Sequence, residues 1–306
     1  MQCPCCLLAW TEGVELDPAA FYDQSYFDDV DSPKGYNDYF SLASAMERTC
    51  DARIRRLRRL MPGARSLLDA GCGPGYFVHR AARAGLETWG LEVSAFAARF
   101  GRDRLGQRIV NGPIDAVHLD RIESSFDLIT MWDTIEHLAA PDEAIALLAD
   151  KLEPGGVMSL STGDVAALAA RLTGRAWHLF NLPEHLWFFS VPALKRLCRR
   201  AGLEVLRVER EVCWYTAQYL LDRLMYSLGR NALRFRGDSI LKRLSVPISL
   251  FDIVTIHARK PATTRNAEVE RHESELQAPA RKFAVAEPFG AREPARLRSR
   301  LGSMVS

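Results

Sequence analysis

The stretch that decides the fold runs from Ser66 to Phe77 and reads S-L-L-D-A-G-C-G-P-G-Y-F. Its apolar run, which ends in Asp69, predicts a buried β-strand, and Tyr76 to Ala84 predicts the helix after the turn. Glycine admits positive φ and a close approach of ligand to backbone, so the turn suits a nucleotide-like cofactor. Three glycines stand at alternate positions of this turn: Gly71, Gly73 and Gly75.

The spacing of the glycines separates two kinds of cofactor. A dinucleotide fingerprint requires glycine at the sixth position of the turn, where this chain has Tyr76. Leu86 to Ser94 predicts a second strand that ends in Glu92, about 20 residues after the glycines, the distance at which an acid binds ribose hydroxyls. A nicotinamide oxidoreductase is therefore the less favoured alternative.

Strands and helices continue to alternate along the chain. Ser125 to His137 predicts a fourth strand that runs into a loop, and Arg108 to Asn111 predicts the shorter third strand. Pro141 to Leu152 predicts a helix, Pro154 to Gly156 a turn and Val157 to Ser161 the fifth strand. Two further helices are predicted at Val165 to Leu172 and Val191 to Ala201. Leu203 to Glu211 and Phe251 to Lys260 predict the two final antiparallel strands.

These blocks resemble a known family of enzymes. The glycine loop with Asp69 in front is similar to the S-adenosylmethionine loop of class I methyltransferases. The set F-D-L-I-T-M-W-D-T-I-E-H-L … L-E-P-G-G-V-M-S-L-S-T resembles their ubiquinone-biosynthesis-like branch. The resemblance covers roughly Phe21 to Lys260 and implies an α/β fold. That fold is a Rossmann-like, doubly wound, seven-stranded sheet with an antiparallel last strand.

The resemblance also implies S-adenosylmethionine as the cofactor and assigns residues to it. Glu92 would take both ribose hydroxyls, and Asp69 would organise the loop near the methionine end. The loop from Met131 to Asp133 would line the methionine portion, and Asn111 and Ile114 would lie beside the adenine. The complete predicted cofactor set is Asp69, Gly71, Cys72, Gly73, Gly75, Tyr76, Glu92, Val93, Asn111, Ile114, Met131, Trp132 and Asp133.

Two histidines are the predicted catalytic residues. Methyl transfer to oxygen or nitrogen needs a group that removes a proton, and a histidine near neutral pKa can do so. His137 follows the fourth strand, and His185 lies in an aromatic segment that predicts a pocket wall on the acceptor side, Trp177 to Ser190. His178 is a weaker third candidate. Asp133, Glu136 and His137 could serve as ligands of a divalent ion, but no metal site is predicted.

Composition limits the class of protein. With 306 residues, the chain can hold one large α/β domain with small additions. Its net charge of +2 gives no overall basic surface for nucleic acid, and no partner of that kind is expected. A run of 18 apolar residues is absent, so a cytoplasmic enzyme is expected. Seven scattered cysteines argue against a disulfide scaffold.

The two ends of the chain predict segments outside the main domain, which is expected to span residues 41–260. Many methyltransferases of this branch carry an N-terminal zinc ribbon, and residues 1–40 resemble a truncated form of it. Cys3, Cys5 and Cys6 supply three thiols, whereas tetrahedral zinc needs four ligands. Zinc binding is therefore not predicted. Residues 261–306 are charged, contain prolines and lack periodicity, which predicts disorder.

Two basic stretches allow more than one interpretation. The arginine run within residues 41–61 predicts a helix whose basic face is solvated, rather than a nucleic-acid site. Trp214 to Pro247 predicts a helical insertion with alternating apolar and basic positions. Such an insertion could act as a lid packed on the body, touch an anionic membrane, or hold a lipid-linked or anionic acceptor.

The function predicted from these observations is methyl transfer from S-adenosylmethionine. The expected acceptor is an oxygen of a small metabolite, a quinone precursor or a glycan intermediate. A non-catalytic protein that binds S-adenosylmethionine is the alternative from another class, because cofactor motifs do not establish turnover. Methylation of nucleic acid is disfavoured, since Met131 to Thr134 stands where an N-P-P-Y-like tetrapeptide would be expected. No oligomeric state is predicted.

Overall fold

The computed structural model describes residues 1–14, 17–28, 42–122, 124–221, 240–242 and 244–262. Residues 1–262 form one compact unit. The predicted disordered tail lies outside the described residues, except for Pro261 and Ala262. Within the described part, no helix has the length and apolar character needed to cross a membrane.

A seven-stranded sheet forms the centre of the unit, with the strand order β4-β3-β2-β5-β6-β11-β8. The first five strands of this order are parallel, whereas β11 runs antiparallel to both of its neighbours. The predicted doubly wound fold with an antiparallel last strand is confirmed. In the same order the strands are Ile109–Asn111, Glu87–Glu92, Ser66–Ala70, Phe126–Trp132, Leu152–Gly163, Ile253–Arg259 and Glu204–Arg210.

The predicted turn at residues 154–156 is part of strand β6 instead. Phe126 of β5 faces Leu152, but Leu128 faces Val157, so residues 153–156 lie opposite the single residue Asp127. Gly155 has a positive φ of 83°, which supports this local departure from the ladder. The segment therefore bulges out of the sheet without ending the strand.

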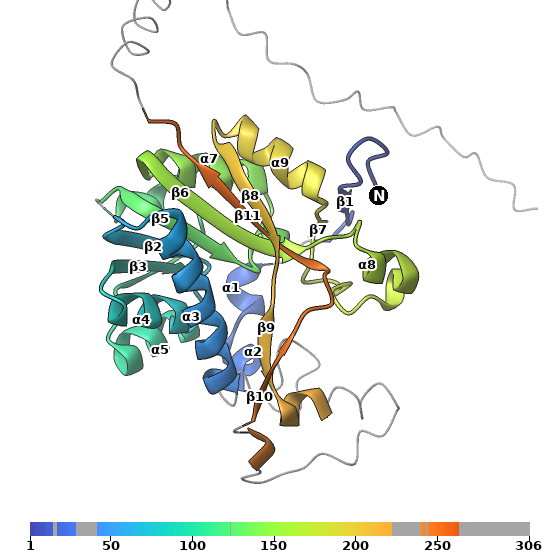
Figure 1. Ribbon diagram of the computed structural model, residues 1–306, viewed down its shortest axis with the longest axis horizontal. Helices are drawn as coiled ribbons and strands as arrows, with labels where there is room; N and C mark the ends of the chain where they lie inside the picture. Colours follow the sequence, from blue (N-terminus) through green and yellow to red (C-terminus); the bar gives the residue numbers. More distant parts are fainter. Residues whose placement is uncertain (15–16, 29–41, 123, 222–239, 243, 263–306) are drawn as a thin grey trace, which may run out of the picture. The chain divides into compact units, whose positions relative to one another are not determined.

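Helices cover both faces of the sheet (Figure 1). Leu67 of β2 packs in one cluster with Leu57 and Phe77, whereas its neighbour Leu68 packs on the other face with Leu148. Alternate strand residues thus point into separate cores, as expected of a sheet buried on both sides. One face carries α3 (Ala43–Leu60), α4 (Tyr76–Arg83) and α5 (Ala95–Leu105), and the other carries α6 (Ala116–Asp120), α7 (Pro141–Asp150) and α9 (Val191–Arg200).

The N-terminal segment packs on the aromatic segment that follows the fifth strand. Strand β1 (Ala9–Trp10) pairs antiparallel with β7 (Trp187–Phe188), and Ser190 donates a hydrogen bond to the carbonyl oxygen of Cys6. Three short helices and one further turn of helix occupy the loops nearby. They are α1 (Pro18–Phe21), α2 (Gln24–Asp28), α8 (Leu168–Thr173) and the 3₁₀ helix η3 (Gly174–Ala176).

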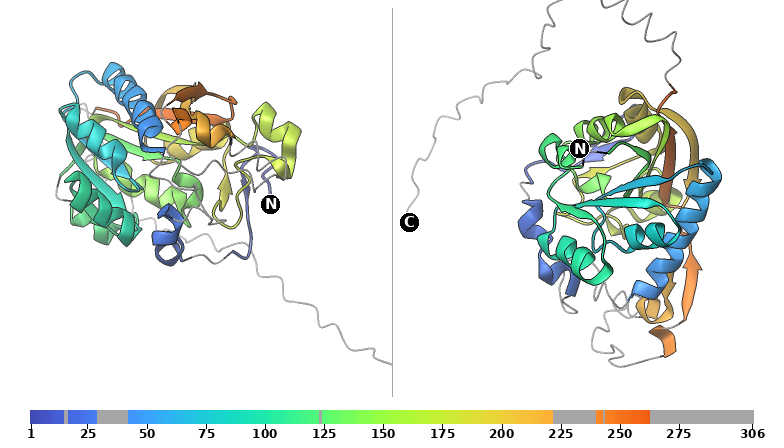
Figure 2. Two further views of the ribbon diagram at one scale, coloured as in Figure 1. Left: turned by 90° about the horizontal axis from the view of Figure 1, so that it is seen from below. Right: turned by 90° about the vertical axis from the view of Figure 1, so that its left-hand side faces the viewer.

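The predicted helical insertion at residues 214–247 begins and ends as strands, which corrects that expectation. Strand β9 (Cys213–Thr216) pairs antiparallel with β10 (Ser245–Ile248), with Trp214 opposite Pro247. Both views in Figure 2 and the view in Figure 1 show this hairpin alongside α3. Helical backbone is present at 217–221 and at η4 (Ile240–Lys242), while 222–239 lie outside the described residues.

Candidate active site

The carboxyl ends of four parallel strands meet at one edge of the sheet. Strand β2 lies between β3 and β5, so Asp69 is next to the ends of both neighbours. Glu92 ends β3, Asn111 ends β4 and Trp132 ends β5. In open α/β sheets ligands bind at this edge, where the direction of strand order reverses. The predicted cofactor residues are therefore brought together from four separate strands.

The glycine loop adopts a backbone conformation that side chains disfavour. Gly71, Gly73 and Gly75 have positive φ values of 76°, 54° and 85°. Gly75 is the N-cap of α4 and is left-handed. A Cβ atom at Gly71 would lie 2.4 Å from Cγ2 of Thr134, in the loop that follows β5. The glycine loop and the loop after β5 thus touch closely, and only glycine fits at position 71.

Glu92 holds the glycine loop and the start of α5 in place. Its side chain is buried and accepts the backbone N–H of Gly73 at 2.7 Å and that of Ser94 at 2.8 Å. Burial raises the pKa of Glu92. Each carboxylate oxygen has two lone pairs, so both can still accept a hydrogen bond from a ligand hydroxyl. The chemistry of this residue fits the ribose of S-adenosylmethionine.

Asp69 lies below the loop, within the sheet. It is buried and accepts a hydrogen bond of 2.7 Å from the hydroxyl of Thr130 on the neighbouring strand. Burial raises the pKa of Asp69 to about 7, although the Thr130 hydroxyl and the charge of Arg53 act in the opposite direction. The acid therefore organises the carboxyl end of β2 from inside the protein.

Asn111 and Cys72 have structural contacts that explain their positions. The Asn111 side-chain amide donates to the carbonyl oxygens of Glu92 at 2.9 Å and Val93 at 3.0 Å, which fixes the turn after β3. The thiol of Cys72 is buried against Gly90, where an added Cβ would lie 2.6 Å from the sulfur. Both residues shape the backbone of the predicted cofactor site.

The other predicted cofactor side chains differ in how far they reach the edge. Met131 is fully buried in the core on the α7 side, so its side chain points into the protein interior. Ile114 is half-buried and packs against that same core. Tyr76 is half-buried at the start of α4, with its ring centroid 6.2 Å from that of Phe100. Only the backbone of Met131 is available at the sheet edge.

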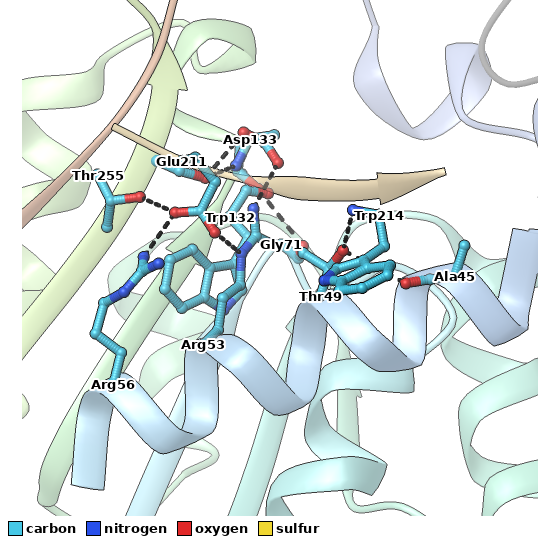
Figure 3. A network of polar contacts seen from close by, with 12 residues as sticks. Ala45, Thr49, Arg53, Arg56, Gly71, Trp132, Asp133, Glu211, Trp214 and Thr255 are labelled. Atoms are coloured by element: carbon cyan, nitrogen blue, oxygen red, sulfur yellow. Dashed lines mark hydrogen bonds and ion pairs between the residues drawn. The ribbon is translucent and has the colours of Figure 1, made fainter. Parts of the chain in front are cut away.

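Trp132 and Asp133 are held by a buried arginine from α3 (Figure 3). The guanidinium of Arg53 lies 4.3 Å from the centroid of the Trp132 ring and 3.3 Å from a carboxylate oxygen of Asp133. Asp133 has a positive φ of 51° and also accepts a hydrogen bond of 2.8 Å from Ser161. Asp133 therefore faces Arg53 and Ser161.

The helix arginines are only partly solvated, contrary to the expectation for the basic run. Arg53 is 7% exposed and pairs with Glu211 at 3.3 Å in addition to Asp133. Arg56 donates to Glu211 at 2.8 Å, whereas Arg55 and Arg59 are exposed. The difference arises because acidic partners from distant segments surround one side of the helix.

A second polar cluster combines Glu136, His137 and His185. Their potential ligand atoms all lie within 4.8 Å of one another, and the two histidine ring centroids are 4.6 Å apart. Glu136 is buried, and its Oε2 has no hydrogen-bond partner among the described residues. Burial and the charge of Asp133 raise the pKa of Glu136 to about 8. The two predicted catalytic histidines are thus in contact with each other.

The hydrogen bonds of His137 determine which ring nitrogen carries the proton. Its Nδ1 lies 2.9 Å from the carbonyl oxygen of Glu184 and 2.9 Å from the hydroxyl of Tyr22. A carbonyl oxygen can only accept, so Nδ1 is assigned the proton, and Nε2 is the nitrogen without one. The backbone of Asp133 is a further hydrogen-bond partner of this ring. Burial lowers the pKa of His137 below its ordinary value. The ring is therefore neutral at pH 7 and able to accept a proton at Nε2.

His185 is the weaker base of the two. Burial and then the neighbouring His137 lower the pKa of His185 to about 3. Since a base is most effective when its pKa lies near the working pH, His137 is better suited to proton removal. His178 is not part of this cluster; its Nδ1 lies 3.5 Å from a carboxylate oxygen of Asp252.

The same cluster offers the donor types of a metal centre. Two imidazoles and a carboxylate are ligands that zinc, manganese and iron bind. Among the residues that the structure describes, this is the group of three or more such side chains that converges. Asp133 does not belong to it, and neither do Cys3, Cys5 and Cys6. The sequence suggested Asp133 as the third possible ligand beside Glu136 and His137, whereas in the structure His185 takes that place.

Tyr22 is a site residue that the sequence interpretation did not identify. It follows α1, touches His137 through its hydroxyl, and accepts a hydrogen bond from the Ser94 hydroxyl at its carbonyl oxygen. Burial raises the pKa of Tyr22, which keeps the hydroxyl protonated. The run of aromatic residues from Phe21 to Phe27 was the feature of the sequence that could have identified it. Its contact with His137 connects the N-terminal segment to the site.

Comparisons with known proteins agree with this geometry. Residues 42–208 match the family model described as a methyltransferase domain. The chain is 28% identical over 151 residues to the ubiquinone biosynthesis O-methyltransferase of Azoarcus sp., which covers 46% of this chain and 65% of the relative. The corresponding enzyme of Aromatoleum aromaticum is 30% identical over 153 residues, covering 45% and 63%. The match thus spans less than two thirds of either relative.

One solved structure compares well in fold alone. A provisionally assigned methyltransferase of Bacillus halodurans superposes with a TM-score of 0.50 at 13% identity, over 69% of this chain and 100% of that one. The fold, the glycine loop and the acid at the end of β3 are those of class I methyltransferases, which use S-adenosylmethionine. The chain belongs to the methyltransferase domain family.

Proposed function

We propose that this protein transfers a methyl group from S-adenosylmethionine to a hydroxyl oxygen of a small aromatic acceptor of the quinone-precursor type. The observation that carries the proposal is the neutral His137 imidazole, which the Glu184 carbonyl holds through Nδ1 in the loop that follows β5. The names of the two relatives support an oxygen acceptor. The reaction and its substrate are proposals for this chain, because the relatives match over only part of their length.

The cofactor site suits a cationic ligand. S-adenosylmethionine supplies an electrophilic methyl group on a positively charged sulfur. Glu92 and the glycine loop would hold its nucleoside part, and the backbone of the loop after β5, which Asp69 and Asp133 support from inside the protein, would line its methionine part. Opposite charges in a partly desolvated site attract more strongly than in water. The residues present therefore fit the cofactor implied by the family.

His137 would remove the acceptor proton. Its Nδ1–H is held by the Glu184 carbonyl, so Nε2 can take the hydroxyl proton while the oxygen attacks the methyl carbon. The Tyr22 hydroxyl contacts the same Nδ1 at 2.9 Å and further restrains the ring. His185 is buried and His137 is half-buried, which limits the access of water and favours methyl transfer over competing reactions.

A cavity between the N-terminal segment and the aromatic segment is a candidate site for an apolar part of the acceptor, although none of Glu136, His137 and His185 lines it. It has a volume of about 310 Å³ and is lined by Trp10, Val14, Phe180, Leu182 and Phe188 among others. The ring centroid of Phe188 lies 6.2 Å from that of His185, so one residue of the cavity wall is a neighbour of the histidine pair. Aromatic and aliphatic walls favour a planar apolar ligand.

Calorimetric titration tests the cofactor, and an isotope assay tests the reaction. Wild-type protein should bind S-adenosylmethionine and S-adenosylhomocysteine but not NADH, and Glu92→Ala should lose both adenosyl ligands. Tritium from S-adenosylmethionine labelled in its methyl group should then enter phenolic acceptors. Adenosyl binding without label transfer to any acceptor would support the non-catalytic alternative, and NADH binding would contradict the methyltransferase assignment.

The acceptor panel should also separate the remaining alternatives. Glycan intermediates and lipid-linked phenols belong in the same assay, because each offers a hydroxyl oxygen. Membrane contact through residues 214–247 calls for a separate experiment, liposome flotation of the full chain and of a variant without 217–244. Equal recovery of both proteins with anionic vesicles would contradict membrane contact through this segment.

A further inference from the structure

A single guanidinium connects three parts of the protein. Arg53 extends from α3, its Nη2 lies 3.3 Å from a carboxylate oxygen of Asp133, and its Nε lies 3.3 Å from a carboxylate oxygen of Glu211. Asp133 follows β5 at the cofactor edge, whereas Glu211 stands two residues before the hairpin strand β9. The network therefore lies between the β9–β10 hairpin and the loop after β5, which is called the cofactor loop below (Figure 3).

The two carboxylates differ in how much they depend on Arg53. Glu211 has further partners, since Arg56 donates to it at 2.8 Å and Thr255 at 2.5 Å. Asp133 has one cationic neighbour among the described residues, together with a hydroxyl hydrogen bond from Ser161. Loss of the guanidinium would thus leave Glu211 paired and would remove the ion pair of Asp133.

Arg53 also constrains the residues on either side of this ion pair. Its guanidinium covers the Trp132 ring at 4.3 Å, and the next residue has the left-handed φ of 51°. A non-glycine residue keeps this conformation only where its surroundings hold it there. The ion pair and the ring contact together fix two consecutive residues of the cofactor loop.

We propose that Arg53 is a positioning residue for the cofactor site. It holds Trp132 and Asp133 in the conformation that binds the methionine part of the cofactor. Through Glu211 it joins this loop to the β9–β10 hairpin. The inference rests on the proposed function, because it assigns a role toward S-adenosylmethionine to a residue that does not itself line the sheet edge.

The experiment measures binding of S-adenosylhomocysteine by calorimetry with the full chain. Arg53→Met should weaken binding about tenfold, within the range found for coupled neighbours. Arg53→Lys, which keeps the charge but not the planar fork, should recover part of the loss. Arg55→Met is a matched control on the exposed face of α3, and Arg56→Met removes the other arginine from Glu211. Both should bind within about twofold of wild type.

A double-mutant cycle distinguishes positioning from general stability. If Arg53 acts through Asp133, then Asp133→Asn combined with Arg53→Met should lose no more affinity than Arg53→Met alone. Additive losses would overturn the proposal, and so would equal weakening by Arg56→Met and Arg53→Met. Urea unfolding of each variant identifies any that does not fold. If Arg53→Met is such a variant, the cycle is run with Arg53→Lys.

The outcomes also separate this inference from the function on which it depends. Wild-type protein that binds no adenosyl ligand contradicts the proposed function, and the role of Arg53 fails with it. If Arg53→Met binds S-adenosylhomocysteine as tightly as wild type does, the proposed function stands and only the role of Arg53 is contradicted.

Discussion

The hydroxyl of Tyr22 lies 2.9 Å from Nδ1 of His137, although 115 positions separate the two residues in the chain. The contact brings the segment before the domain into the candidate active site. It also places a second polar atom beside the nitrogen that bonds to Glu184. The orientation of the His137 ring therefore depends on an N-terminal residue as well as on the loop after β5.

Replacement of Tyr22 by phenylalanine tests this dependence. The variant keeps the ring contact with His137 but loses the hydroxyl, so the imidazole should sample orientations in which Nε2 is misdirected. We expect kcat to fall about tenfold, near the lower end of general-base contributions, with little change in cofactor affinity. Steady-state kinetics and calorimetry measure the two quantities. Tyr26→Phe is a matched control, and equal losses in both variants would argue against a role specific to Tyr22.

Removal of the His137 imidazole should have the larger effect. His137→Gln should lower kcat/KM by about a hundredfold or more, because it removes the base. Since burial lowers the pKa of His137, wild-type activity should rise as pH increases through a value below 6.5 and be level at neutral pH. The variant should lack this rise. His118→Gln, altered in α6 beside Asp115, is the control and should keep the wild-type profile.

The same assay with a chelator separates proton transfer from metal activation. A reaction that depends on the His137 base continues after dialysis against EDTA. Loss of activity on dialysis, restored by zinc or manganese, would instead assign Glu136, His137 and His185 to a metal centre. Metal analysis of the purified protein gives an independent answer, with His185→Ala as the variant that should lose the ion.

A methyl group at position 71 should abolish cofactor binding. Gly71→Ala combines a positive φ of 76° with a Cβ that would lie 2.4 Å from Thr134, so the glycine loop must move. Gly106→Ala is a matched control, because its φ is 66° but no atom lies within 4 Å of the added Cβ. The control should lose only about 1 kcal/mol of stability and bind normally. Equal binding by both variants would show that contact with Thr134 does not shape the site.

Asp69 should make the stability of the protein depend on pH. Burial raises its pKa to about 7 in the folded protein, compared with about 3.9 in an unfolded chain. The folded state thus keeps a proton that the unfolded state has lost, so this contribution to stability is full below the unfolded pKa. It is lost as pH rises through about 7.

Asp69→Asn removes this titration and should flatten the profile. The free energy of unfolding of wild type should fall with pH more steeply than that of the variant, by up to about 1.4 kcal/mol per pH unit between the two pKa values. Urea unfolding of the protein without ligand at several pH values measures the difference. Asp120→Asn, an exposed replacement in α6, should keep the wild-type slope. Parallel profiles for Asp69→Asn and wild type would contradict the raised pKa.

The sequence predicted the parts of the site that local pattern controls. The glycine loop, the strand that ends in Glu92 and the order of the main strands follow from turn residues and hydrophobic runs a few positions apart. Arg53 appeared as one member of a solvated basic run. Its burial depends on Asp133 and Glu211, which lie 80 and 158 positions away and approach only in the folded chain. The basicity of the two histidines likewise depends on tertiary burial.

The indole of Trp132 gives the protein an optical signal at the proposed cofactor edge. The ring is 9% exposed, its Nε1 has no hydrogen-bond partner among the described residues, and a guanidinium covers one face. Indole emission responds to nearby charge, so a cationic ligand that arrives beside Asp133 should change the fluorescence of this residue. The chain has 6 tryptophans, and the difference between wild type and Trp132→Phe isolates the signal of this one. Cofactor exchange can then be followed in real time without a label.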